Sequence, residues 1–149
     1  MTKHDLLTYA RAVKRLRTLD AQIRGYEDAE LYSANNRAPT PLPYDHGNAV
    51  SPDVLAGRVE KRDEMQKRRE ALEAEAEEGM RYIFIACHVL DHSEIEFAKL
   101  RYVGKKKGDF PYPQPVEDFF DLARMLGISR RKCFIVQRTI LEKVAEIQV

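Results

Sequence analysis

Residues 116–129, which read VEDFFDLARMLGIS, decide the fold of the C-terminal part of the chain. Apolar side chains recur in this stretch at spacings of three and four, at Phe119, Leu122, Ala123 and Leu126. That spacing predicts one apolar face of a helix over residues 116–126. Gly127 follows where helix ends favour a left-handed residue, and Ser129 is a favourable N-cap for a second helix. We therefore expect a helix-turn-helix.

The second helix of this motif begins with three cations and buries an apolar side made of Cys133, Val136, Ile140 and Val144. Cations in a first turn oppose the helix dipole, which suggests that they serve binding rather than stability. An exposed helix of this kind can enter the major groove of DNA and contact phosphates. The expected DNA-binding residues are Ser129, Arg130, Arg131, Lys132, Phe134, Gln137 and Arg138, with Lys105, Lys106 and Lys107 from a neighbouring basic loop.

The N-terminal part, residues 1–90, is expected to form a long antiparallel helical hairpin with a connecting loop at 35–50. Its first helix covers residues 5–33 and carries an apolar stripe at Leu6, Tyr9, Val13, Leu16, Leu19, Ile23 and Tyr26. Ser51 and Pro52 begin a second helix that runs to about residue 90. Its apolar seam is thin, so we expect a second chain to complete it in a homodimer.

Three further features complete the predicted all-α fold. The glycine at position 79 is a candidate bend, and the apolar run over residues 80–87 fits a helix better than a strand because periodic segments flank it. The segment Asp91-His92-Ser93 is expected to cap a third helix over residues 94–103. A loop then follows over residues 104–115. The domain division is thus an arm over 1–90 and a DNA-binding domain over 91–149.

Charge is distributed unevenly along the 149 residues, although the net charge is only +1. Residues 99–149 hold 11 Lys and Arg against 6 Asp and Glu, while residues 1–98 hold 14 against 18. A basic C-terminal part behind an acidic helical part fits a DNA-binding domain on a solvated arm.

The remaining chemistry is sparse. The two cysteines, Cys87 and Cys133, make neither a disulfide framework nor a zinc pattern. No signal peptide or membrane span is expected. We therefore expect a reduced, cytoplasmic setting. His88 and His92 lie one helical turn apart near Cys87, but no fourth ligand accompanies them, so packing is favoured over metal binding. We find no nucleophile with its base and no phosphate-binding glycine loop, and so expect no enzyme and no cofactor.

Three segments resemble region four of bacterial sigma factors, the domain that binds an upstream promoter element. They are EIEFAKLRY at residues 94–102, DLARMLGIS at 121–129 and ILEKV at 140–144. With a charged helical arm in front, the chain resembles phage late-gene transcription regulators of the RinA and ArpU type. That resemblance implies a DNA-binding activator of phage or prophage transcription, in the cytoplasm of the host, with its reading helix over residues 129–138.

The sequence departs from the sigma pattern at two places. The loop at 104–115 is longer than the usual turn, and the apolar Phe134 and Ile135 stand where polar base-reading side chains are usual. Phe134 can contact a thymine methyl, or pack against another subunit or the lysine loop. The alternative function is therefore a coiled-coil interaction protein that engages RNA polymerase or a phage DNA-packaging component of the small-terminase kind.

Overall fold

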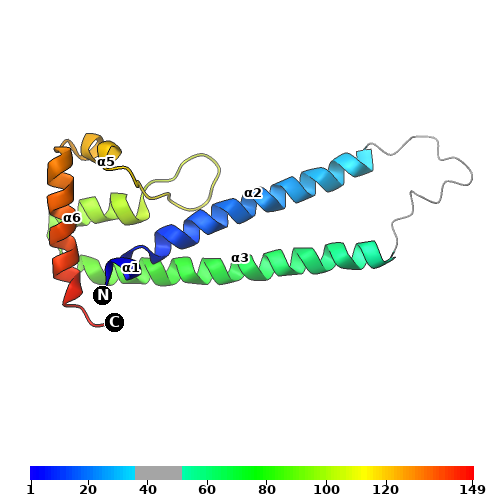
Figure 1. Ribbon diagram of the computed structural model, residues 1–149, viewed down its shortest axis with the longest axis horizontal. Helices are drawn as coiled ribbons and strands as arrows, with labels where there is room; N and C mark the ends of the chain where they lie inside the picture. Colours follow the sequence, from blue (N-terminus) through cyan, green and yellow to red (C-terminus); the bar gives the residue numbers. More distant parts are fainter. Residues whose placement is uncertain (36–51) are drawn as a thin grey trace, which may run out of the picture. The chain divides into compact units, whose positions relative to one another are not determined.

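The computed structural model describes residues 1–35 and 52–149, and its regular elements are helices (Figure 1). In chain order they are α1 (Lys3–Leu6), α2 (Thr8–Asn35), α3 (Pro52–Cys87), α4 (His92–Ala98), the π-helical segment η2 (Lys99–Val103), α5 (Phe119–Leu126) and α6 (Arg130–Ala145). These residues contain no strand, only an isolated antiparallel bridge between Lys105 and Gln114. The all-α class is confirmed. The expected loop at 35–50 lies, apart from Asn35, outside the described residues, as does Ser51.

The described chain divides into two compact units, Met1–Arg15 with Leu72–Val149, and Leu16–Ala71. We call them the first and the second unit. The first unit combines the N-terminus with the C-terminal residues, whereas the sequence suggested a boundary near residue 90. Two long-range hydrogen bonds are among the contacts that connect these two parts of the chain. The Tyr9 hydroxyl donates to the Pro113 carbonyl at 3.1 Å, and the N-terminal ammonium of Met1 donates to the Ile147 carbonyl.

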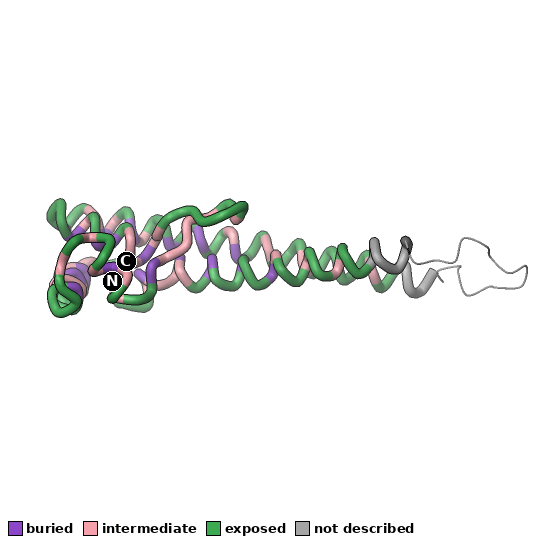
Figure 2. The backbone as a smooth tube through the Cα atoms, turned by 90° about the horizontal axis from the view of Figure 1, so that it is seen from above, coloured by how far each residue is buried: buried purple, intermediate pink, exposed green. Residues whose placement is uncertain are grey.

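Every helix of the first unit contributes buried residues to its core. Figure 2 marks the buried residues along the backbone. The largest fully buried side chains of this unit are Leu6, Val13, Phe97, Tyr102, Leu122, Cys133, Ile140 and Val144. Tyr9 is also buried, and burial raises its pKa to about 12 because the phenolate would lose its hydration. Apolar burial of this kind is the main stabilising term for the unit.

Helix α3 continues through Gly79, where the sequence suggested a bend. A Cβ atom built on Gly79 would lie only 2.3 Å from the backbone nitrogen of Tyr9. The glycine therefore serves the close approach of α2 to α3 within the first unit. The apolar run at 80–87 is helical, as predicted, and α3 ends at Cys87 rather than near residue 90.

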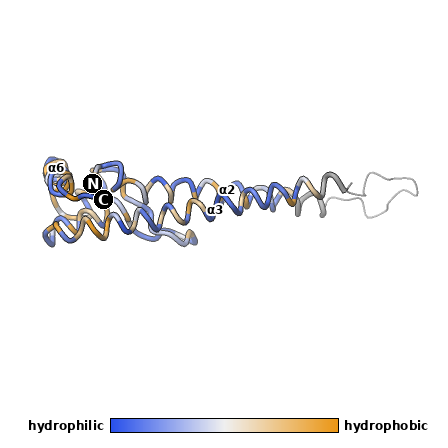
Figure 3. The backbone as a smooth tube through the Cα atoms, turned by 90° about the horizontal axis from the view of Figure 1, so that it is seen from below, coloured by the Kyte–Doolittle hydropathy of each residue, from blue (hydrophilic) through white to orange (hydrophobic). Residues whose placement is uncertain are grey.

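In the second unit, α2 and α3 are antiparallel and contact one another. Arg69 pairs with Asp20 at 3.5 Å, and the Lys61 ammonium lies 5.3 Å from the centre of the Tyr26 ring. Polar and apolar residues alternate along both helices (Figure 3). Leu16 and Leu19 are buried, but past Leu19 none of the described side chains of this unit is. The contact between the helices is therefore half-open to solvent.

Within the expected capping segment 91–93, Asp91 is the N-cap of α4, through a reciprocal pair of hydrogen bonds. Its carboxylate accepts from the Glu94 N–H at 2.9 Å, and the Glu94 carboxylate accepts from the Asp91 N–H at 3.0 Å. The helix expected over 94–103 instead begins at His92 and changes to the wider η2 after Ala98. Gly104 ends it with a φ of 86°, a conformation that favours glycine.

The close approach at Gly79 predicts opposite effects for two glycine-to-alanine changes. Gly79→Ala would overlap the Tyr9 backbone and should lower the free energy of unfolding by about 1–3 kcal/mol. Gly25→Ala is the matched control, because nothing lies within 4 Å of the added Cβ, and should raise it by about 0.4–1 kcal/mol. Urea denaturation followed by circular dichroism measures both. Equal effects of the two changes would contradict the close packing.

The Asp91 cap predicts a pH-dependent contribution to stability. Hydrogen bonds from the Glu94 N–H and the Ser93 hydroxyl hold the pKa of Asp91 below its usual 3.8. The contribution is therefore fully present above the unfolded-state pKa and is lost as the pH falls through the lower folded-state value. Asp91→Asn should be less stable than the parent chain at neutral pH, and the gap in free energy of unfolding should narrow in acid. Chemical denaturation at several pH values tests this, and a gap that widens in acid would refute it.

Candidate nucleic-acid interface

Helices α5 and α6 are joined by three residues whose conformations follow from their side chains. Gly127 has a left-handed backbone with a φ of 65°, and its N–H donates to the Ala123 carbonyl. The Ser129 hydroxyl accepts the Lys132 N–H at 3.1 Å and so caps α6. Both local predictions are confirmed. The turn sends the chain from the eight residues of α5 into the sixteen residues of α6.

The start of α5 differs from the expected position at residue 116. Asp118 is the N-cap, since its carboxylate accepts the Phe120 N–H at 2.9 Å. Val116 is instead tied to the preceding segment, because its N–H donates to the Leu100 carbonyl at 3.0 Å. The helix therefore begins at Phe119, so Glu117 and Asp118 precede its first turn, and Asp121 is the acidic residue within that turn.

The inner side of α6 packs on α5 and α4. Cys133, Ile140 and Val144 are buried there as predicted, and Val136 is half-buried. The Lys143 ammonium donates to the buried carboxylate of Glu94, which ties the last turn of α6 to the start of α4. This hydrogen bond raises the pKa of Lys143. The orientation of α6 is thus fixed by apolar burial and by one charged contact.

Four exposed cations lie on the rest of α6 and at its beginning, namely Arg130, Arg131, Lys132 and Arg138. None of them has an ion-pair partner among the residues that the structure describes. Two other cations of the first unit are ion-paired, namely Arg124, which lies 3.5 Å from Asp121, and Lys143, which contacts Glu94. No acidic residue stands in the first turn of α6 to offset the charge. The four cations form a positive surface in which none of them is ion-paired within the described chain.

Two apolar residues interrupt this positive surface. Phe134 is 52% exposed, and its ring meets the Phe119 ring edge-on with centroids 4.5 Å apart. It is therefore partly engaged in holding α5 against α6. Ile135 is 56% exposed and points away from the buried side. It follows Arg131 by four residues and precedes Arg138 by three, so the three share one face of the helix.

Gln137 lies apart from the other predicted contact residues of α6. It follows Cys133 by four residues and precedes Ile140 by three, and helical spacing therefore places it on the inner side. Its side chain is half-buried, and its Oε1 atom is buried without a hydrogen-bond partner. The structure thus brings together Ser129, the four cations, Phe134 and Ile135, and leaves Gln137 behind them.

The lysines at 105–107 are exposed but lie in a different place. Their loop begins where Gly104 approaches the Gln114 carbonyl so closely that a Cβ atom would lie 1.6 Å from its oxygen. Lys105 and Gln114 then exchange backbone hydrogen bonds of 3.1 and 2.9 Å. In Figure 1 the loop lies at the end of the α4–η2 segment away from α6. The structure does not bring these lysines into the surface made by α6.

Arg101 is not among the expected contact residues, but it contacts the backbone just before α5 and the first residue of that helix. It donates to the carbonyls of Val116 and Glu117 at 3.2 and 2.6 Å. Its guanidinium also lies 4.9 Å from the centre of the Phe119 ring. The side chain therefore fixes the entry into α5. The only sequence signal for it is its place in the segment that resembles sigma factors.

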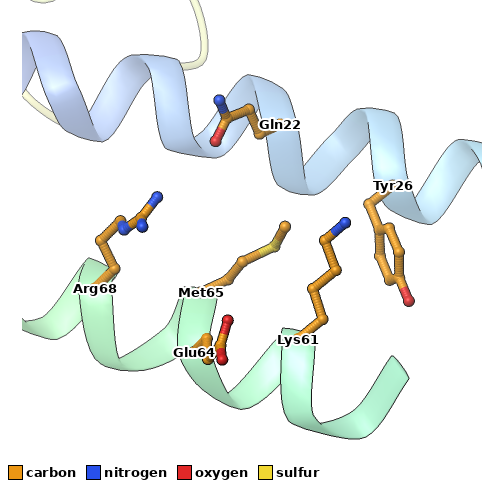
Figure 4. Close-up of a pocket in the computed structure, with 6 residues that line it drawn as sticks. All are labelled: Gln22, Tyr26, Lys61, Glu64, Met65 and Arg68. Atoms are coloured by element: carbon orange, nitrogen blue, oxygen red, sulfur yellow. The ribbon is translucent and has the colours of Figure 1, made fainter. Parts of the chain in front are cut away.

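Two other places in the described chain are candidate sites, the histidines at 88 and 92 and a pocket in the second unit, and neither has a set of side chains suited to metal binding or catalysis. His88 packs its ring on Phe84 and His92 lies 3.2 Å from Glu96. Among the residues that the structure describes, no three His, Cys, Asp or Glu side chains are grouped to hold a metal. A pocket of about 520 Å³ in the second unit (Figure 4) is lined by Gln22, Tyr26, Lys61, Glu64, Met65 and Arg68, a mixed set without a nucleophile and its base.

Comparison of the chain with protein-family models, with curated proteins and with solved structures found no match. No helix in the described part of the chain is long and apolar enough to span a membrane. The assignment of the α6 surface therefore depends on its residues and their geometry.

The position of Arg101 predicts a structural effect that an exposed arginine nearby should not have. Arg101→Ala removes two charge-assisted hydrogen bonds and the contact with Phe119, and should lower the free energy of unfolding by about 1.5–3 kcal/mol. Arg124→Ala, on the exposed side of α5, should change it by less than about 0.5 kcal/mol. Urea denaturation of both variants measures the difference. A destabilisation no larger than that of the control would show that Arg101 does not hold α5.

Proposed function

We propose that the chain binds duplex DNA through the outward surface of α6 and acts as a regulator of transcription. The observation that carries the proposal is the group of four exposed cations without ion-pair partners on one short helix-turn segment. Uncompensated cations at a helix start oppose the dipole and one another, so their placement suggests an anionic partner. DNA phosphates supply that partner, and binding would release condensed counterions.

In this proposal α5, the turn at 127–129 and α6 act as a helix-turn-helix. The short α5 would cross the backbone while α6 enters the major groove, which is wide enough for one helix. The left-handed Gly127 and the Ser129 cap support this assignment because they set a compact turn. Ser129 lies at the N-terminal end of α6 and would contact the DNA backbone together with the cations.

The regulatory role, in a phage or prophage, rests on the resemblance to sigma region four and to the RinA and ArpU type. We further propose that two copies act together, joined along the helical hairpin made by α2 and α3. The half-open contact between these helices supports this, since Ile23, Tyr26 and Met65 are only half-buried and Val59 is 56% exposed. A second helical hairpin would bury this apolar surface.

An interaction protein that engages polymerase or a packaging component is the second candidate. Exposed apolar side chains favour it, because Phe120 is 61% exposed and Met125 is 43% exposed on α5. Such side chains are common at protein interfaces. The positive surface favours DNA more strongly, because four cations without ion-pair partners among the described residues match the regularly spaced phosphates of a duplex.

Retention of the pure full-length chain on random-sequence duplex DNA at low salt tests the proposal. The parent chain should be retained, and the Arg130→Ala, Arg131→Ala double variant should bind more weakly to all sequences alike. For every phosphate that the variant no longer neutralises, the slope of log affinity against log salt should become shallower by about 0.9. Light scattering on the same sample measures how many copies of the chain associate.

The matched control is the Arg81→Ala, Lys99→Ala double variant, which removes the same charge from two exposed residues of the first unit outside α5 and α6. It should keep the affinity and the salt slope of the parent chain. If both double variants weakened DNA binding equally, the effect would depend on net charge alone and not on the α6 surface. Absence of binding by the parent chain at any salt concentration would refute the proposal and favour the interaction protein.

A further inference from the structure

Ile135 is the apolar residue at the centre of the positive face of α6. Single exposed apolar residues are common on protein surfaces and need no explanation by themselves. This one is distinguished by its position, because Arg131 stands one turn before it and Arg138 one turn after it. Phe134, its apolar neighbour, is partly covered by the Phe119 ring. Ile135 is thus the more freely exposed apolar group of the face.

The charges around Ile135 restrict what can cover it. A second copy of the same face would bring unpaired arginines against arginines, and like charges in an interface are costly. A polyanion is the complementary partner. On duplex DNA the major-groove edges of the bases carry hydrogen-bonding groups, and the C5-methyl group of thymine is the apolar exception.

We propose that Ile135 contacts the C5-methyl group of a thymine in the major groove while Arg131 and Arg138 hold the flanking phosphates. This inference rests on the proposed DNA binding and deepens it by naming a base that the surface selects. The cations supply affinity for any sequence, since phosphates are the same in all of them. Ile135 adds preference for positions that carry a methyl group.

The experiment begins with selection by the full-length chain from duplexes with a randomised core of about 20 base pairs, two turns of B-DNA. Thymine should be enriched at one or more fixed positions. In the selected duplex, each thymine is then replaced by deoxyuridine, which differs only by lacking the methyl group. Affinity should fall roughly fourfold at the contacted position, the factor that corresponds to exposing one buried methyl group.

Variants connect the effect to Ile135. Ile135→Ala should bind the thymine and deoxyuridine duplexes equally, and Ile135→Val should keep part of the preference. Val89→Ala is the control, because it trims another exposed apolar side chain of the first unit, outside α5 and α6, and should keep the full preference. Circular dichroism of each variant confirms that its helices are intact.

The outcomes separate the inference from the proposed function. DNA binding without thymine enrichment, or with equal affinity for thymine and deoxyuridine, overturns the inference and leaves the proposed function standing. A thymine preference that persists in Ile135→Ala also overturns it. Failure of the parent chain to bind any duplex overturns both.

Discussion

The guanidinium of Arg101 holds together the part of the first unit from which the α6 surface is presented. From η2 it reaches the carbonyls of Val116 and Glu117, which lie just before α5. It also lies over the ring of Phe119, the first residue of α5. That ring contacts Phe134 on α6 edge-on. One side chain therefore connects the backbone before α5 with the first turns of α6.

A second polar contact acts at the other end of α6. Glu94 is only 4% exposed, and its carboxylate accepts from the Asp91 N–H and from the Lys143 ammonium. Ion pairs that bury a carboxylate often contribute little net stability, because the carboxylate loses its hydration. We infer that this pair mainly fixes the register of α6 on α4. With Arg101 at the first turns and Glu94 at the last, α6 is held at both ends.

Features that depend on a few neighbouring residues could be predicted from the sequence. The left-handed Gly127, the Ser129 cap and a cap within residues 91–93 were predicted correctly, because capping uses hydrogen bonds within about three residues. The role of Gly79 could not be predicted, because its neighbour Tyr9 is distant in sequence. The grouping of the N-terminus with the C-terminal residues escaped prediction for the same reason.

Two differences between expectation and structure had signals in the sequence. Gln137 stands between Cys133 and Ile140 at helical spacings, so its inward position followed from the apolar pattern. The helix was expected to begin at residue 116, but Asp118 has a short carboxylate that can accept a backbone N–H. It is therefore a better N-cap for α5 than Val116. Arg101 gave no signal from spacing or charge. Its hydrogen bonds are made to backbone carbonyls, and carbonyl positions depend on the tertiary path of the chain.

The surface of α6 also sets a limit on how selective one copy of it can be. Contacts from cations to phosphates carry no sequence information directly, so adding cations raises affinity without raising discrimination. One apolar contact with one methyl group gives a factor of roughly four. If the proposed DNA binding is to be specific, two copies on two half-sites multiply that factor to roughly sixteen. The proposed pairing through α2 and α3 would therefore serve sequence selection as well as burial of the half-open helical contact.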